Sequence, residues 1–205
     1  MRVFFALELD PATAVQVADW RERQFSFAAS PPGGRDSAGR TSAGRTSAGR
    51  SSAGRPVPPA NFHITLAFVG DLREPSLEQL CGAVDNWLEA SDPAPSGSSI
   101  RLDTIGYWPK PGIYWLGPDS WPDQLTELAG KLRGLATSAG GKRDRNRFQP
   151  HVTLFRGCSG APPPPVEPPD FTLAYSHFTL FESRQGRKGV SYHPLQDWRL
   201  EGRRF

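Results

Sequence analysis

Twice in this chain a histidine is followed by an apolar residue, a threonine and a leucine: in NFHITLAFVG (residues 61–70) and in FQPHVTLFR (residues 148–156). Both stretches are rich in β-branched and aromatic residues and have a turn-forming residue at one end, which predicts two β-strands. Side chains two positions apart in a strand point to the same face of a sheet. His63 is therefore expected to share a face with Thr65, and His151 with Thr153.

The apolar residues that alternate with these polar ones are expected to face a core: Ile64, Leu66 and Phe68 in the first stretch, and Val152 and Leu154 in the second. Each stretch then presents an imidazole and a hydroxyl on one side and is anchored on the other. Two imidazoles that face one cleft can serve as a general acid and a general base. Both stretches are entered from a proline-containing approach, which suggests two lobes of similar construction.

The composition is that of a folded protein without a membrane helix. The 205 residues are 37% hydrophobic, with 6 Trp and 12 Phe, enough to bury a sizeable core in one domain or two small lobes. No apolar run approaches the roughly 18 residues that a membrane-spanning helix requires. The N-terminal segment reaches Glu8 too early for a secretory signal and is expected to form a strand.

Residues 36–55 form a repeat of four five-residue units that each end in Ser-Ala-Gly-Arg. The repeat holds four arginines against Asp36 alone and so accounts for the formal net charge of +3. Without large apolar side chains it cannot offset its ordering entropy, so we predict a disordered insertion at about 33–56 within a single domain, 1–205. The alternative is a basic arm that attracts phosphates.

Neither the cysteines nor the histidines have the spacing of a metal site. Cys81 falls on an apolar helical stripe and Cys158 follows a predicted strand, so we expect free thiols in a reduced, cytoplasmic protein. Zinc sites need three or four clustered ligands, and the sequence contains neither His-x-His nor His-Glu-x-x-His. We therefore expect no metal and no cofactor.

Predicted helices and strands are mixed without regular βαβ alternation, which favours an α+β fold with antiparallel pairing. Helices are expected at about 10–25, 75–88 and 122–136. Besides the two motif strands, strands are expected at 2–8, 100–105, 112–116, 171–181 and near Tyr192.

Paired histidines suit the formation or hydrolysis of a phosphodiester. Histidine titrates near pH 6.5 when unperturbed, so one imidazole can be neutral and take a proton while the other is charged and gives one. Thr65 and Thr153 could hydrogen-bond phosphoryl oxygens, and Arg156 could neutralise their charge. Arg156 follows His151 by five residues, so an ideal strand would place it on the opposite face unless the strand bends.

A third copy of the pattern, His177-Phe178-Thr179-Leu180, lies on the predicted strand 171–181. Its histidine would share a mostly apolar and aromatic face, so we interpret His177 as a packed or edge histidine without a catalytic role. His193 lies in a predicted turn region and is expected to be exposed. A single His-x-Thr pattern is more often structural than catalytic, and the pattern alone leaves both interpretations of the paired motifs open.

These motifs resemble the two-histidine (2H) phosphoesterase superfamily, and within it the bacterial and archaeal RNA 2',3'-cyclic phosphodiesterases, also called 2'-5' RNA ligases. The resemblance covers nearly the whole chain: RVFFALEL (2–9), PPANFHITLAFVG (58–70), PHVTLFR (150–156), LFES (180–183), GVSY (189–192) and WRL (198–200). The repeat at 36–55 departs from the family, which has a short connection before the first motif.

The resemblance implies a two-lobed α+β fold, with antiparallel sheets lining a central cleft and helices outside. It also implies metal-independent hydrolysis of RNA 2',3'-cyclic phosphate ends to 2'-phosphate ends. By position, His63 matches the family's proton donor and His151 its proton acceptor, while Thr65, Thr153 and Arg156 match phosphate-contacting positions. RNA ends or small cyclic nucleotides are the expected partners of a monomer that makes no membrane contact.

Two other functions fit the same residues. The chain could act on another cyclic phosphate or a 2'-5' linkage, such as a tRNA-splicing product or a small nucleotide, and the chain-length dependence of turnover would separate this case. It could instead be an RNA-end-binding module with little turnover, helped by the basic repeat. Its salt-dependent binding would then be unchanged in a His63→Ala variant.

Overall fold

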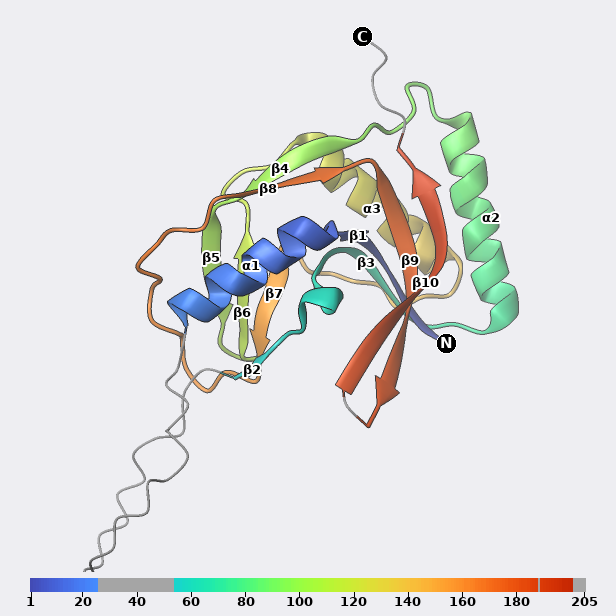
Figure 1. The fold of residues 1–205 in the computed structure, drawn as a ribbon. Helices are drawn as coiled ribbons and strands as arrows, with labels where there is room; N and C mark the ends of the chain where they lie inside the picture. The colour runs from blue at the N-terminus through green and yellow to red at the C-terminus, as the bar shows by residue number, and fades with distance from the viewer. Residues whose placement is uncertain (26–53, 188, 201–205) are drawn as a thin grey trace, which may run out of the picture.

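The computed structural model describes residues 1–25, 54–187 and 189–200 and shows an α+β protein with antiparallel strands (Figure 1). Its α-helices are α1 (Pro11–Gln24), α2 (Glu74–Ala90) and α3 (Asp123–Ser138), and η1 (Pro59–Asn61) is a short 3-10 helix. Its strands are β1 (Arg2–Glu8), β2 (Arg55–Pro56), β3 (His63–Asp71), β4 (Ser98–Leu102), β5 (Thr104–Trp108), β6 (Ile113–Gly117), β7 (Val152–Arg156), β8 (Phe171–Tyr175), β9 (His177–Gly186) and β10 (Gly189–Arg199). The predicted fold class and the three predicted helices are confirmed.

Eight of the described strands form one antiparallel sheet in the order β10-β9-β1-β3-β7-β6-β5, with β2 paired to β7. The other two, β4 and β8, form a separate ribbon. The two expected lobes are thus halves of one continuous sheet: β1, β3, β9 and β10 make the first half, and β5, β6 and β7 make the second. Within the described residues, the halves meet where β3 pairs with β7, at the single position Ile64↔Val152.

α2 and α3 lie against the first half of the sheet, and α1 lies against the second half (Figure 1). α3 packs against β3 in the first half, and α2 is tied to β10 by Trp198 Nε1, which donates to Asp85 at 2.6 Å. α1 follows β1 in the chain but packs on the second half, where Phe25 contacts Tyr114 and Phe155 edge-on at 5.2 and 5.9 Å. The core therefore joins elements from both parts of the sequence.

The helix-start signals explain where the helices begin. Asp10 caps α1, its carboxylate accepts from the Thr13 N–H at 2.9 Å, and Pro11 takes the first helical position. α2 begins at Glu74, one residue before the predicted Pro75, and α3 follows Pro122. Each helix start therefore lies within two residues of its prediction.

Two predicted strands are each broken into two. The stretch 100–105 divides at Asp103, whose carboxylate accepts from the Asp119 N–H at 2.9 Å; β4 before it pairs with β8, and β5 after it pairs with β6. The stretch 171–181 divides at Ser176, whose carbonyl accepts from the Leu200 N–H at 2.8 Å. Alternation alone could not show these breaks, because the hydrophobic pattern continues across both.

Most of the Ser-Ala-Gly-Arg repeat lies outside the described residues, so the disorder expected there stays a prediction. Its last arginine differs from that prediction, since Arg55 and Pro56 form β2 and pair with Arg156 and Phe155. Cys81 and Cys158 are both free thiols. Among the described residues, no helix combines the length and apolar character needed to cross a membrane.

Candidate active site

The two motif strands are neighbours and run antiparallel across the seam of the sheet. Their shared pair, Ile64 and Val152, consists of the residues that directly follow the two histidines. Because the strands are antiparallel, His63 lies opposite Thr153 and Thr65 lies opposite His151. Both histidines therefore lie at the centre of the sheet, next to the position where the two motif strands pair.

Each motif strand contains a β-bulge at the leucine of its motif. In β3, Thr65 pairs with Ala6 and Ala67 pairs with Phe5, so Leu66 is an extra residue. In β7, Thr153 pairs with Trp115 and Phe155 pairs with Tyr114, so Leu154 is an extra residue. A bulge places two consecutive residues of one strand opposite one position of its partner and so changes which face the later residues occupy.

The bulges carry the fifth residue after each histidine to the face that bears the histidine. Arg156 pairs with Ile113, which shares a face with Trp115, so the bulge supplies the bend that an ideal strand lacked. Phe68 occupies the equivalent position in β3 and pairs with Phe4. The predicted core position of Phe68 is therefore wrong: its side chain is 56% exposed. We call the face that carries His63, Thr65, Phe68, His151, Thr153 and Arg156 the motif face.

The two histidines are oriented in the same way. His63 Nδ1 lies 2.8 Å from the carbonyl oxygen of Asn61, and His151 Nδ1 lies 2.7 Å from that of Gln149, two residues earlier in each case. A carbonyl oxygen can only accept, so Nδ1 donates and carries the proton in the neutral ring. Nε2 of each ring is thereby left as the atom that can take or give a proton.

Aromatic side chains surround both imidazoles. The ring of His63 lies 5.0 Å from Phe4 and 4.9 Å from Tyr192, centroid to centroid. The ring of His151 lies 4.5 Å from Trp108 and 6.3 Å from Trp115. These rings exclude water from one side of each histidine, which disfavours its charged form.

This environment lowers the pKa of both histidines. Burial lowers the pKa of His63 to about 4, the positive charges of Arg156 and His151 add to the effect, and the hydrogen bond to Asn61 opposes it. Burial also lowers the pKa of His151, with Arg156 acting in the same direction against the bond to Gln149. Both rings are thus neutral at physiological pH in the free protein, and an anion bound beside Arg156 would favour their charged forms.

The structure brings the five predicted site residues to one face. Thr65 is half-buried and Thr153 is buried, while Arg156 is exposed at the end of β7. The positive charge of Arg156 lowers the pKa of both histidines, because it repels a charged imidazole. Imidazoles, hydroxyls and a guanidinium on one face suit the binding of a phosphate and proton transfer around it.

The third motif has a different environment. His177 is an exposed residue at the start of β9, with Nε2 3.9 Å from Glu8 Oε2. The Thr179 hydroxyl lies 2.7 Å from an oxygen of Asp197 and 3.2 Å from one of Glu8. Two carboxylates around this hydroxyl disfavour a phosphate there. β9 lies between β1 and β10, so His177 stands at the exposed end of an interior strand and is neither packed in the core nor on an edge strand, contrary to both predicted placements. That His177 has no catalytic role stays a prediction.

His193 differs from its prediction. It lies inside β10 rather than in a turn and is half-buried, with Nε2 3.0 Å from the Ser191 hydroxyl. Gly189 to Arg199 extends the last strand well beyond Tyr192, because β10 pairs along the whole of β9. Within the part of the chain that the structure describes, no three His, Cys, Asp or Glu side chains are grouped as metal ligands.

Sequence reasoning missed the aromatic residues of the motif face: Phe4, Phe68, Trp108, Trp115 and Tyr192. Alternation along β1 separates Phe4 from Phe5, but only the pairing to β3 shows that Phe4 lies beside His63. Trp108 and Trp115 were visible as bulky residues on a predicted hairpin. Their place beside His151 depends on the pairing of β6 with β7, for which the sequence carries no local signal.

Comparison with known proteins identifies the family. The model of the "LigT like Phosphoesterase" family matches residues 31–115 and again residues 116–192, one match for each motif. The chain belongs to this family of two-histidine phosphoesterases. The resemblance found in the sequence is therefore confirmed.

The chain is similar over nearly its whole length to a curated relative. It is 32% identical to the RNA 2',3'-cyclic phosphodiesterase of Escherichia coli (strain K12), over 97% of this chain and 96% of the relative. It is 30% identical to the protein of that name from Thermus thermophilus, over 72% and 76% of the two chains. The crystal structure of E. coli LigT complexed with 3'-AMP matches with a TM-score of 0.77 and 31% identity, covering 97% of each chain.

Proposed function

We propose that this protein hydrolyses RNA 2',3'-cyclic phosphate ends to 2'-phosphate ends without a metal ion. The observation that carries the proposal is the matched orientation of His63 and His151. Each ring donates from Nδ1 to the backbone and leaves Nε2 for the substrate, on the same face as Arg156. The names of the relatives from E. coli and T. thermophilus support the same substrate class.

The proposed reaction needs one proton acceptor and one proton donor. His151 Nε2 takes a proton from a water molecule as its oxygen attacks phosphorus. The bond between phosphorus and the ribose 3'-oxygen breaks, and His63 Nε2 gives a proton to that oxygen. The products are a 2'-phosphate and a free 3'-hydroxyl.

The hydroxyls and the guanidinium stabilise the phosphate while the bonds change. Thr65 and Thr153 donate to the non-bridging oxygens, and Arg156 balances the negative charge that builds up on them. The bound anion also opposes the effect of Arg156 on the pKa of His63 and so favours the protonated ring that the donor role needs. The assignment of His63 as donor and His151 as acceptor follows the order of the motifs in the family.

Phe68 supports a nucleotide rather than an inorganic substrate. Its exposed ring lies on the motif face, at the position that corresponds to Arg156 in the other half. Nucleobases stack on such rings with little dependence on sequence. We propose that the terminal base of the RNA stacks on Phe68 while the cyclic phosphate lies between the histidines.

The deciding experiment uses a short RNA that ends in a 2',3'-cyclic phosphate, incubated with the protein in excess EDTA. The position of the phosphate in the product is then determined. A 2'-phosphate product is the expected result. Activity that requires added metal would overturn the mechanism, and absence of any reaction would overturn the proposed substrate.

The donor and acceptor roles can be separated by a substrate with a better leaving group. In the 4-nitrophenyl ester of a 3'-deoxynucleoside 2'-phosphate, no 3'-hydroxyl can attack phosphorus in place of water, and the departing 4-nitrophenolate needs no proton. His63→Ala should then retain much more of the wild-type rate than it does on the cyclic phosphate, whereas His151→Ala should remain defective. Preserved activity in His151→Ala instead would reverse the two roles.

We further propose that the protein acts as a monomer in the cytoplasm. Both motifs come from one chain and meet in one sheet, so the site needs no residue from a second copy. The free thiols of Cys81 and Cys158 suit a reducing compartment. Sedimentation of the purified protein should give the mass of a single chain, and a dimer would contradict the first part of this proposal.

A further inference from the structure

We propose that Arg21 is a positioning residue that holds Arg156 on the motif face through the bulge at Leu154. Arg21 lies on α1, which packs on the opposite face of the second half, and its side chain is only 4% exposed. It cannot touch a substrate. The inference rests on the proposed function, because it assumes that Arg156 binds the phosphate.

The Arg21 guanidinium reaches from α1 to the bulge. Its Nη1 donates to the carbonyl oxygen of Val57 at 2.5 Å and to that of Leu154 at 3.3 Å. Leu154 is the extra residue whose presence turns Arg156 to the motif face. The Val57 N–H also donates to the Leu154 carbonyl at 2.9 Å. The bulge is therefore held by a network that has Arg21 at its centre.

Two aromatic rings fix the guanidinium in place. Its Cζ lies 5.4 Å from the centroid of Phe62 and 5.5 Å from that of Phe155, and Glu22 forms an ion pair with it at 3.6 Å. Phe62 directly precedes His63, and Phe155 directly precedes Arg156. A planar guanidinium suits this arrangement, since it can stack on rings while donating to carbonyls in its plane.

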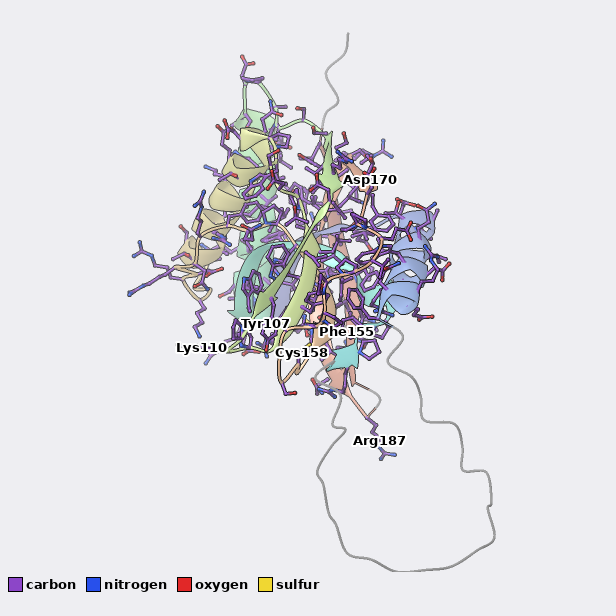
Figure 2. All side chains as sticks on the ribbon, turned by 90° about the vertical axis from the view of Figure 1, so that its left-hand side faces the viewer. Tyr107, Lys110, Phe155, Cys158, Asp170 and Arg187 are labelled. Carbon is purple, nitrogen blue, oxygen red and sulfur yellow. The ribbon has the colours of Figure 1, made fainter. Side chains whose placement is uncertain are left out.

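The chain is anchored again just beyond Arg156. The Cys158 N–H donates to the Gly112 carbonyl at 2.9 Å. The Cys158 carbonyl accepts from the Tyr107 hydroxyl at 3.3 Å, and Figure 2 shows where these two residues lie. Arg156 thus lies between two fixed points, the Leu154 bulge and Cys158. A shift of the bulge must therefore change the direction of the Arg156 side chain.

The first half contains an equivalent contact. Arg133 of α3 donates from Nε to the carbonyl oxygen of Leu66 at 3.3 Å, and its Cζ lies 5.5 Å from the ring of Phe148. Leu66 is the bulge residue that turns Phe68 to the motif face. Arg133 therefore offers a matched control, because its loss should disturb Phe68 and leave Arg156 in place.

The test is a double-mutant cycle on the RNA with a 2',3'-cyclic phosphate end. Arg21→Met keeps an unbranched side chain but removes the donors, and it should lower kcat/KM by roughly ten- to a hundredfold. In an Arg156→Ala background the same substitution should have less than about a twofold further effect, because the group that it positions is gone. Arg133→Met should have the same effect in both backgrounds.

Equal losses from Arg21→Met with and without Arg156 would overturn the inference, since Arg21 would then act only on the fold. If Arg21→Met does not fold, the same double-mutant cycle is measured with Arg21→Lys, which keeps one cationic donor. Hydrogen exchange of residues 152–158 gives a readout that needs no activity. Exchange there should be faster in Arg21→Met, and unchanged exchange would overturn the inference even if the wild type proved inactive and the proposed function failed.

Discussion

Among the strands that the structure describes, Ile64 and Val152 form the one paired position that joins the two halves of the sheet, and each directly follows a motif histidine. The pair acts as the centre of an approximate two-fold relation. On both sides of it the chain repeats the same series: a half-buried histidine, a core residue, a threonine, two consecutive core residues and a residue turned back to the motif face. The family model also matches the chain twice, once across each motif, which agrees with this repeat.

The first prediction concerns the two histidines. His63→Ala and His151→Ala should each lower turnover of the cyclic phosphate by roughly a hundred- to ten-thousandfold, because each removes one proton transfer. Turnover is measured as 2'-phosphate released from a short RNA. His177→Ala is the control and should match the wild type, since His177 is exposed at the start of β9 and lies beside Glu8. A comparable loss in that control would give the third motif a catalytic role.

The pH dependence of kcat/KM follows from the lowered pKa values. The rate requires one protonated and one neutral imidazole in the free enzyme, so the optimum lies midway between the pKa of His63 and that of His151. Burial and Arg156 lower both values below 6.5, so the optimum should lie on the acid side of pH 6.5. Arg156→Gln should raise both values and move the optimum upward. An optimum above pH 7 in the wild type would contradict the lowered pKa values.

The same pKa values link stability to pH. A histidine whose pKa is lowered by folding binds more protons in the unfolded state, so its stabilising contribution is full above pH 6.5 and is lost as the pH falls toward its folded-state value. For His63 that window extends from about 6.5 down to about 4. The free energy of unfolding, measured in urea, should fall between pH 7 and pH 5 by on the order of 1 kcal/mol more in the wild type than in His63→Gln. Equal falls in both proteins would show that His63 does not titrate in this way.

Much of the fold was predictable from local sequence signals. The Asp10-Pro11 start of α1 and the apolar stripes of α2 and α3 predict the helices, because capping and helical periodicity act over a few residues. The two His-x-Thr patterns predict which residues gather at the site. His63 and His151 lie where strand periodicity places them relative to Thr65 and Thr153.

The remaining features depend on pairing between distant strands. The bulges at Leu66 and Leu154 exist because at each of these points the motif strand carries one residue more than its neighbour can pair; β3 carries a second extra residue, Val69, between Phe68 and Gly70. Because apolar residues occupy both bulges, the local sequence looks like regular alternation. A prediction from alternation therefore assigns Phe68 to the wrong face of the sheet. The strand break at Ser176 is equally hidden, because β8 and β9 join different partners on its two sides.

Phe68 provides a test of base recognition. Phe68→Leu should raise KM for a nucleoside 2',3'-cyclic phosphate roughly five- to a hundredfold, from the loss of about 1–3 kcal/mol of stacking, and Phe68→Tyr should keep the wild-type value. The effect should vanish with a base-free ribose 2',3'-cyclic phosphate. Val15→Ala removes another exposed apolar side chain, on α1, and should change neither substrate's KM. An equal rise in KM for the base-free substrate would exclude stacking as the cause.

Gly106 has no side chain and so leaves room for the indole ring of Trp115, which lies beside His151. It pairs with Trp115, and a Cβ at Gly106 would overlap the indole ring, which therefore lies flat across β5. Gly106→Ala should displace this ring, lower the free energy of unfolding by about 1–3 kcal/mol and expose His151. The pKa of His151 should then rise toward 6.5, and the pH optimum of kcat/KM should move upward with it. Titration of the His151 ring protons by NMR checks this directly.

The matched control is Gly82→Ala on α2, where an added Cβ meets no atom within 4 Å. Alanine favours a helix more than glycine does, so this variant should be more stable by up to about 1 kcal/mol and have an unchanged pH profile. The two substitutions add the same methyl group, so a difference between them reports on the contact with Trp115 alone. If Gly106→Ala loses stability but keeps the wild-type titration of His151, the Trp115 ring supports the sheet without setting the protonation of the site.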